Sequence, residues 1–215
     1  MSTFFFDLDG PILDVSEKYY QTYCYSINEL SYSPLTKMQY WELKKHKVPD
    51  DIILSLSGVK IEQVELYKQR RNEVIETKEF LKYDYVWKEM FEILPKLKKD
   101  NTLNILTSRT YSEIAKQQIT ELGLNMFFEE VIVAECLSDK RWKDKGKILQ
   151  EFNKKSNAEK VFMIGDTETD ILAGKSAGVI TIGVDYGIRD KDWLELVSPD
   201  FLVGSISNLF EILKI

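Results

Sequence analysis

The chain has 215 residues, of which 44% are hydrophobic and 30% charged, and its formal net charge is −6. This composition predicts one large domain, or one domain with an insertion, and the negative charge argues against a general nucleic-acid-binding protein. Two distant cysteines, Cys24 and Cys136, offer neither a disulfide framework nor zinc-ligand spacing, so we expect a cytoplasmic protein. No apolar run approaches the roughly 20 residues of a membrane span, and the apolar start stops at Asp7, unlike a signal peptide.

Short apolar runs alternate along the chain with segments of helical periodicity. The runs that predict buried strands are Thr3–Phe6, Leu103–Leu106, Val131–Ala134, Val161–Ile164 and Ile180–Val184. The segments that predict helices between the later strands are Ser112–Leu122, Gly146–Asn153 and Asp170–Ala177. This alternation is typical of an α/β fold in which helices cover a mostly parallel sheet.

The stretch from Val15 to Val86 interrupts this rhythm and contains no convincing strand. Its helical segments are Ser16–Leu30, Lys37–Lys47 and Ile61–Thr77, and its many aromatic residues suit the core of a small helical unit. A helix over Tyr85–Lys99, bent or ended by Pro95, is predicted to return the chain to the sheet. We therefore expect an α/β core formed by residues 1–14 and 87–215, and a helical cap formed by residues 15–86.

Carboxylates follow two of the predicted strands. Asp7 and Asp9 come directly after the first strand, and Asp166 and Asp170 follow the strand Val161–Ile164. Ligands of open α/β sheets bind at the carboxyl ends of the strands, and buried carboxylates need partners there. Each pair alone is also compatible with a polar turn or a charged helix N-terminus. Together they indicate a cation and an anionic ligand.

Hydroxyl and basic groups follow the other two strands of the predicted site. Thr107-Ser108-Arg109 comes after the second strand; a hydroxyl and free N–H groups before a helix suit a phosphoryl group, although such pairs are often only helix caps. A lysine-rich segment, Lys140 to Lys147, precedes the helix predicted at Gly146. Carboxylate oxygens and a phosphate are ligands that suit Mg²⁺.

The single histidine, His46, limits other chemistries. It lies among lysines in what reads as a solvated helix end, and no nucleophile elbow is visible. Acid–base chemistry therefore falls to carboxylates or lysines.

The complete constellation resembles the haloacid dehalogenase superfamily, in its phosphoglycolate-phosphatase-like branch with a helical cap. Asp7-Leu8-Asp9-Gly10 matches the family's first motif, Thr107 the second, and Gly165-Asp166 with Asp170 the fourth. The third motif is a lysine, best matched by Lys145, with Lys143 and Lys147 as rivals. The resemblance covers nearly the whole chain and implies a Rossmann-like three-layer core with the cap inserted after the first strand. Pro11 departs from the Thr or Val usual at that position.

Family membership implies roles for these residues. Asp7 would be the nucleophile that becomes phosphorylated, and Asp9 the general acid and base. Mg²⁺ would be held by Asp7, the carbonyl of Asp9, Asp166 and, directly or through water, Asp170. Thr107, Ser108 and Lys145 would bind the phosphoryl oxygens. The expected enzyme is a Mg²⁺-dependent phosphatase acting on a small phosphorylated metabolite, with no nucleic-acid or membrane partner, as a monomer or dimer.

Several alternatives remain at this point. A phosphomutase keeps both acids and differs mainly in excluding water, whereas a dehalogenase lacks an acid at the position of Asp9. Outside enzymes, a phospho-aspartate switch or an inactive scaffold is possible. The substrate is open among phosphoglycolate, sugar phosphates, nucleotides and pyrophosphate.

Specificity is predicted to come from the cap, because the core motifs bind only phosphate and metal. The candidate contacts, called the cap charges below, are Lys44, Lys45, His46, Lys47, Arg70 and Arg71. The alternative is that these charges lie on solvated helix faces and that the cap selects by shape through its aromatic residues.

Overall fold

The computed structural model describes residues 1–134 and 141–213 and divides the chain into two compact units. The first, here called the core unit, comprises Met1–Asp14 and Val86–Ile215, and the second, the helical unit, comprises Val15–Tyr85. Two short strands, β2 (Leu13–Asp14) and β3 (Tyr85–Val86), pair where the chain passes from one unit to the other. Cys136 and Lys140 lie outside the described residues.

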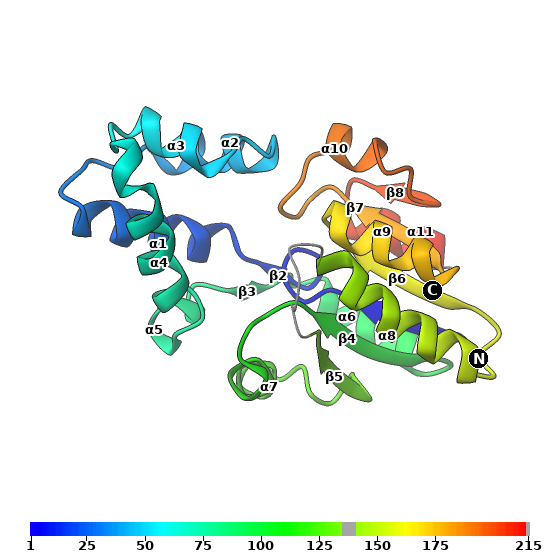
Figure 1. Ribbon diagram of the computed structural model, residues 1–215. Coiled ribbons are helices and arrows are strands. Elements are labelled where there is room, and N and C mark those ends of the chain that lie inside the picture. Colours follow the sequence, from blue (N-terminus) through cyan, green and yellow to red (C-terminus); the bar gives the residue numbers. More distant parts are fainter. Residues whose placement is uncertain (135–140, 214–215) are drawn as a thin grey trace. The chain divides into compact units, whose positions relative to one another are not determined.

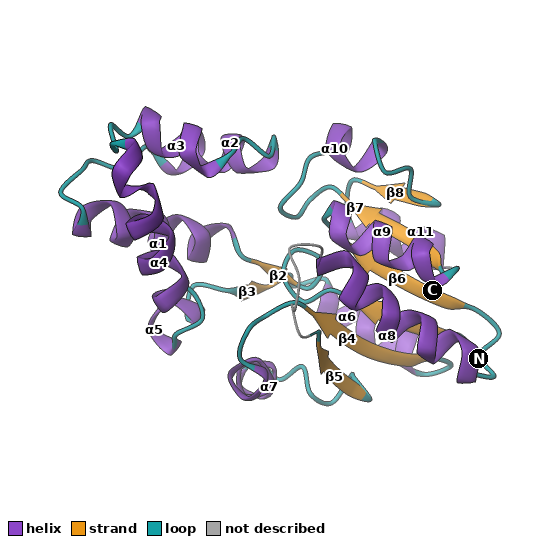
Figure 2. Cartoon of the chain, in the orientation of Figure 1, coloured by secondary structure: helices purple, strands orange, loops and turns teal. Residues whose placement is uncertain are grey.

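The core unit is built on a six-stranded sheet whose order is β5-β4-β1-β6-β7-β8 (Figure 2). Every neighbouring pair in it is parallel, which confirms the predicted α/β fold. The strands are β1 (Thr3–Phe6), β4 (Thr102–Thr107), β5 (Glu130–Val133), β6 (Val161–Gly165), β7 (Ile180–Val184) and β8 (Phe201–Val203).

Helices cover both faces of this sheet. They are α6 (Met90–Lys98), α7 (Ser112–Glu121), α8 (Arg141–Lys155), α9 (Glu168–Ala177), α10 (Lys191–Glu195) and α11 (Ile206–Leu213). Helices α8 and α9 pack together on one face, and α6 and α11 on the other (Figure 1). The unit therefore has the three layers of a Rossmann-like fold.

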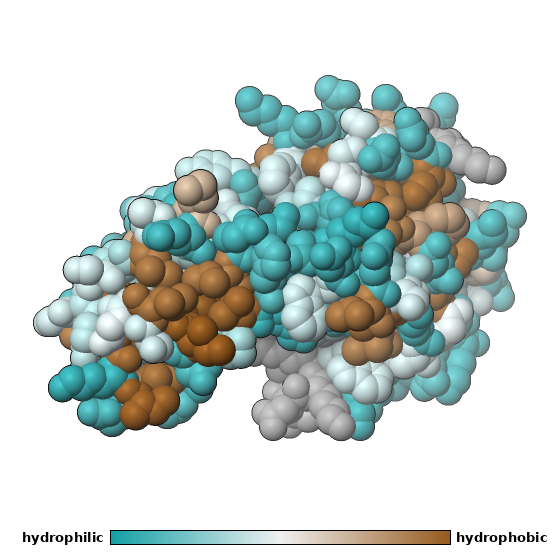
Figure 3. All heavy atoms as spheres, turned by 90° about the horizontal axis from the view of Figure 1, so that it is seen from above, coloured by the Kyte–Doolittle hydropathy of each residue, from teal (hydrophilic) through white to brown (hydrophobic). Residues whose placement is uncertain are grey.

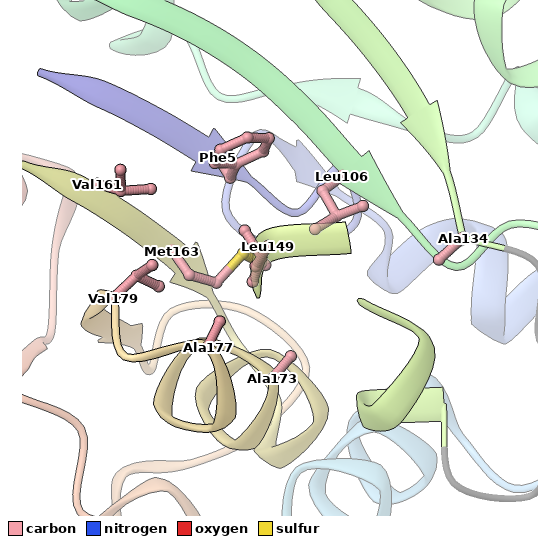
Figure 4. Packing of buried hydrophobic residues seen from close by; sticks show 9 residues of the cluster. All are labelled: Phe5, Leu106, Ala134, Leu149, Val161, Met163, Ala173, Ala177 and Val179. Atoms are coloured by element: carbon pink, nitrogen blue, oxygen red, sulfur yellow. The ribbon is translucent and has the colours of Figure 1, made fainter. Parts of the chain in front are cut away.

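The β1 strand shows how the sequence builds the two faces. Successive side chains of a strand point to opposite sides of a sheet. Phe5 belongs to the buried cluster under α8 and α9, with Met163 of β6 and Leu149 of α8 (Figure 4). Phe4 stacks on Phe162 at 4.5 Å between ring centroids, in register with it across β1 and β6. Because all of β1 is buried, the residue that follows it, Asp7, also lies inside the protein.

The helical unit contains only helices apart from its share of β3. They are α1 (Ser16–Glu29), α2 (Lys37–Lys45), α3 (Asp50–Leu56), the 3₁₀ turn η1 (Ile61–Gln63), α4 (Val64–Val74) and α5 (Lys78–Leu81). Its core is aromatic: Tyr23 stacks on Tyr40 at 4.3 Å, and both pack with Tyr67. A buried ion pair, Lys18 Nζ to Asp84 Oδ2 at 3.0 Å, links the first helix to the residue before β3.

Several predicted boundaries are wrong. The helix predicted from Tyr85 begins only at Met90, after β3, and continues through Pro95 to Lys98. Burial of Ile93, Leu94 and Leu97 on the sheet offsets the hydrogen bond that proline cannot make.

Other segments differ in length or number. The helix predicted over Ile61–Thr77 is a 3₁₀ turn followed by α4, and that over Lys37–Lys47 ends at Lys45, since Lys47 has a φ of 53°. Sequence reasoning missed α3 and α5, and also α10, β8 and α11 near the C-terminus. In the described part of the chain, no helix has the length and apolarity needed to span a membrane.

Candidate active site

Asp7, Thr107 and Asp166 lie at or just beyond the ends of strands that share one edge of the sheet. Phe6 of β1 is in register with Ile105 of β4 and Ile164 of β6. Asp7 therefore lies one residue beyond this level, and Thr107 and Asp166 two residues beyond it. All three side chains are buried. The parallel register explains why residues far apart in sequence meet here.

Three carboxylates form the centre of this site. Ligand oxygens of Asp7, Asp166 and Asp170 lie within 4.8 Å of one another, and all three residues are buried. Burial and then the charge of Asp170 raise the pKa of Asp7 from 3.8 to about 7. Burial, followed by the charges of Asp7 and Asp170, raises the pKa of Asp166 well above its ordinary value. Mutual repulsion of this kind is relieved when a cation binds.

The donor set fits a divalent cation. Oδ2 of Asp166 accepts a hydrogen bond of 2.6 Å from the Ile188 amide, while its Oδ1 is buried and accepts none from the described residues. Such an orphaned carboxylate oxygen requires an explanation, and a bound ion provides one. Carboxylate oxygens are the ligands preferred by hard cations such as Mg²⁺.

Glycines shape the walls of this acidic cluster. Gly10 has a φ of 97°, and a Cβ there would lie 1.9 Å from Oδ2 of Asp166. A Cβ on Gly187 would lie 2.3 Å from the same oxygen. Only a residue without a side chain lets the backbone approach the carboxylate this closely.

Lys145 is the lysine that the structure brings to the acids. Its Nζ lies 3.0 Å from Oδ1 of Asp7 and 2.6 Å from Oδ1 of Asp170, and the side chain is buried. Its neighbouring carboxylates raise the pKa of Lys145 although burial opposes them. The rivals Lys143 and Lys147 are exposed. All three lie within α8, which begins before them at Arg141, so the prediction that this segment precedes the helix is wrong.

Thr107 and Ser108 occupy the junction between β4 and the loop that leads to α7. Thr107 is the last residue of β4 and is buried, and its carbonyl accepts a hydrogen bond of 2.8 Å from the Ala134 amide. Ser108 follows it and is half-buried. Their strand-end position is the one expected for groups that bind a phosphoryl oxygen.

Arg109 is a site residue to which sequence reasoning assigned no role. It is only 5% exposed, and it donates to both carboxylate oxygens of Asp9: Nε to Oδ2 at 3.1 Å and Nη2 to Oδ1 at 2.5 Å. Both oxygens of the Asp9 carboxylate are thus bound by one buried guanidinium. Adjacency to Thr107-Ser108 was the only signal for Arg109, because sequence does not show a contact across 100 residues.

Two aromatic residues hold the turn that follows the first motif. Trp87 Nε1 donates to the Gly10 carbonyl at 2.8 Å, and the Tyr186 hydroxyl donates to the Pro11 carbonyl at 3.3 Å. The two rings pack edge to face at 5.7 Å. The carbonyls of Gly10 and Pro11 in this turn are therefore each bound by an aromatic side chain.

The cap charges have partners within the helical unit. Lys44 pairs with Asp50 at 3.1 Å, and Arg70 pairs with Glu73 on the surface of α4. The guanidinium of Arg71 lies 5.5 Å from the ring centroid of Tyr19.

The remaining cap charges lie at the end of α2. Lys45 is its last residue, the His46 ring contacts the Glu42 carbonyl at 3.0 Å, and Lys47 is exposed. Hydrophobic side chains are also exposed on this unit, including Met38, Leu56 and Ile61. Hydrophobic and hydrophilic residues lie side by side on the molecular face seen in Figure 3. The role of the cap charges in specificity stays a prediction.

Comparison with known proteins identifies the family. The sequence model of the Haloacid dehalogenase-like hydrolase family matches residues 4–184. The chain belongs to this family. The predicted resemblance and the expectation of an enzyme of the hydrolase class are confirmed, and relatives named as phosphatases agree with the phosphatase type.

The relatives match along the whole chain. Pyrophosphatase PpaX from Listeria innocua is 24% identical over 216 residues, which cover 100% of this chain and 97% of the relative. A haloacid dehalogenase-like hydrolase from Streptococcus pneumoniae superposes with a TM-score of 0.78 at 18% identity, covering 99% of this chain and 98% of its own. A predicted phosphoglycolate phosphatase from Haemophilus somnus gives 0.73 at 16% identity, covering 98% and 96%.

Proposed function

We propose that this protein is a Mg²⁺-dependent phosphatase that hydrolyses a small phosphorylated metabolite through an aspartyl-phosphate intermediate on Asp7. The observation that carries the proposal is the buried group of Asp7, Asp166 and Asp170, in which the ammonium of Lys145 contacts Asp7 and Asp170. Family membership and relatives such as the pyrophosphatase from Listeria innocua support the same reaction class.

Asp7 is the nucleophile in this proposal. One of its oxygens attacks phosphorus, the bond from phosphorus to the leaving oxygen breaks, and Asp9 gives that oxygen its proton. Water then attacks the phosphorus of the aspartyl phosphate and loses a proton to Asp9. The phosphorus–oxygen bond to Asp7 breaks, which releases phosphate and restores both acids.

The other residues bind charge. Asp7, Asp166 and Asp170 with the Asp9 carbonyl would hold Mg²⁺, which when bound neutralises carboxylate and phosphate charge. Lys145, Thr107 and the Ser108 N–H would hold the phosphoryl oxygens and thereby stabilise the charge that they carry in the transition state.

Choice of leaving group falls to the helical unit acting as a cap. Pyrophosphate, phosphoglycolate, sugar phosphates and nucleotides are the candidate substrates, and the cap charges are the candidate contacts. A phosphomutase would use the same acids and return the phosphoryl group to a substrate hydroxyl.

A panel of phosphorylated metabolites with MgCl₂, assayed for free phosphate, tests the proposal. The wild type should release phosphate from at least one of them, and excess chelator should stop the reaction. Asp7→Asn should abolish release because an amide is not a nucleophile, while the exposed Asp192→Asn serves as a matched control and should not change the rate. Isomerised product without free phosphate would indicate a mutase, and unimpaired turnover by Asp7→Asn would refute the nucleophile.

A further inference from the structure

The Asp9 carboxylate is bound by a residue outside the four family motifs. Asp9 follows a strand end and lies on a turn, and its side chain is 17% exposed. Arg109 approaches it from the loop after β4 with two parallel N–H groups, at 3.1 and 2.5 Å. A bidentate arginine fixes the plane of a carboxylate as well as its position.

The guanidinium of Arg109 is also hydrogen-bonded to a buried side chain of α7. Its Nη1 donates to Oε1 of Gln118, which lies on α7 and is only 6% exposed. The neighbouring side chains of Ala115 and Ile119 are also buried and anchor this face of α7 in the core. A chain of buried polar contacts therefore runs from the helix through the guanidinium to the carboxylate.

Burial distinguishes this pair from an ordinary surface salt bridge. The side chain of Arg109 is 4% exposed, whereas exposed pairs of the same chain, such as Lys116 with Glu113, lie on helix surfaces at 49% and 89%. Exposed pairs contribute little and reorient freely, but a buried guanidinium with fixed partners has one orientation. The geometry suits a positioning role.

We propose that Arg109, held by Gln118, is a positioning residue for Asp9 that holds its carboxylate in one orientation for proton transfer to the leaving-group oxygen. The proposal rests on the proposed role of Asp9 as the proton donor.

Dependence on the leaving group separates positioning from general damage. An alkyl phosphate needs its leaving oxygen protonated, whereas p-nitrophenyl phosphate leaves readily without a proton. Arg109→Met should lower kcat for the alkyl ester about 100-fold, within the range of general acid catalysis. It should lower kcat for the aryl ester less than about 10-fold, with little change in KM. Arg109→Lys keeps the positive charge but cannot donate two parallel hydrogen bonds to the carboxylate. Its kcat for the alkyl ester should therefore remain low.

Gln118→Leu should also lower kcat more for the alkyl ester than for the aryl ester, but by a smaller factor than Arg109→Met. The matched control is Gln117→Leu, because Gln117 lies on the exposed side of α7 and contacts Glu121 at 2.8 Å. The control should leave both activities unchanged. Equal losses on both esters in Arg109→Met, or wild-type activity in Arg109→Lys, would overturn the positioning role.

Crystal structures of the wild type and Arg109→Met give a measurement that does not depend on turnover. The Asp9 carboxylate should rotate or lose its single orientation in the variant, while the backbone around it stays in place. An unchanged Asp9 rotamer would overturn this proposal whatever the substrate. A wild type that shows the Arg109–Asp9 contact but hydrolyses no phosphate ester would instead overturn the proposed function.

Discussion

Asp7→Asn is expected to stabilise the metal-free protein while it abolishes turnover. The raised pKa of Asp7, about 7 instead of 3.8, means that the folded protein disfavours the ionised carboxylate. The causes are burial first and then the charge of Asp170, only partly offset by Lys145. Asparagine is nearly isosteric with aspartate and carries no charge, so it removes the free-energy cost of an ionised carboxylate at this buried position.

The size of the effect follows from the two pKa values. Between pH 3.8 and 7 the folded state holds a proton on Asp7 that the unfolded state has lost, so the stability of the wild type falls as pH rises. One pKa unit corresponds to about 1.4 kcal/mol, which gives an advantage for Asn of about 2 kcal/mol at pH 5 and about 4 kcal/mol at pH 8. The advantage should vanish below pH 3.8.

Urea unfolding in excess chelator at both pH values measures this advantage. The control is the exposed Asp192→Asn, which should not change the pH dependence. Adding MgCl₂ should stabilise the wild type more than Asp7→Asn, because the variant lacks an anionic ligand. If Asp7→Asn is no more stable than the wild type at pH 8 without metal, the carboxylates do not repel one another as the structure indicates.

Three further predictions concern the same site. Lys145→Met should cost about 3–5 kcal/mol of unfolding free energy, measured in urea, because it leaves buried carboxylates without their cation, whereas exposed Lys147→Met should be neutral. Gly10→Ala should cost about 1–3 kcal/mol in backbone strain and reduce kcat by displacing the adjacent carboxylate; Gly123→Ala, with positive φ but open space, should show the strain alone. Neutralising the cap charges should raise KM for the natural substrate and spare a small aryl phosphate; an unchanged substrate profile would indicate selection by shape.

The sheet and its acidic edge could be predicted because both depend on local patterns. Thr3–Phe6 is a continuous apolar run, and such a run in an α/β sequence is a strand buried on both faces. The positions of Asp7 and Asp166 then follow from topology alone, since parallel strands end at one edge. Lys145 was predicted as the best match for the third motif, but Lys143 and Lys147 stayed as rivals, because the helix was predicted to begin only at Gly146. Once α8 begins at Arg141, its 3.6-residue period turns Lys145 inward and Lys143 and Lys147 outward.

Contacts between distant polar side chains are what the sequence could not provide. Arg109 reads as the basic residue of a loop, and its pairing with Asp9 depends on the approach of two strand ends. Trp87 reads as part of a helix, yet it precedes α6 and holds the Gly10 carbonyl. Both residues act on the turn that carries the first motif, and neither has a periodicity that would reveal its partner.

This difference separates two layers of the site. The acids and Lys145 are placed by β-strand register and helix period, so a sequence that forms the fold also forms the charge cluster. The orientation of Asp9 depends instead on the buried guanidinium of Arg109, in the loop after β4, and on Gln118 of α7, which binds that guanidinium. A chain could keep every family motif and still lose the bidentate contact between Arg109 and Asp9 by a single substitution. Its cluster would remain assembled, but Asp9 would no longer be held for proton transfer, and hydrolysis would slow most for esters whose leaving groups need a proton.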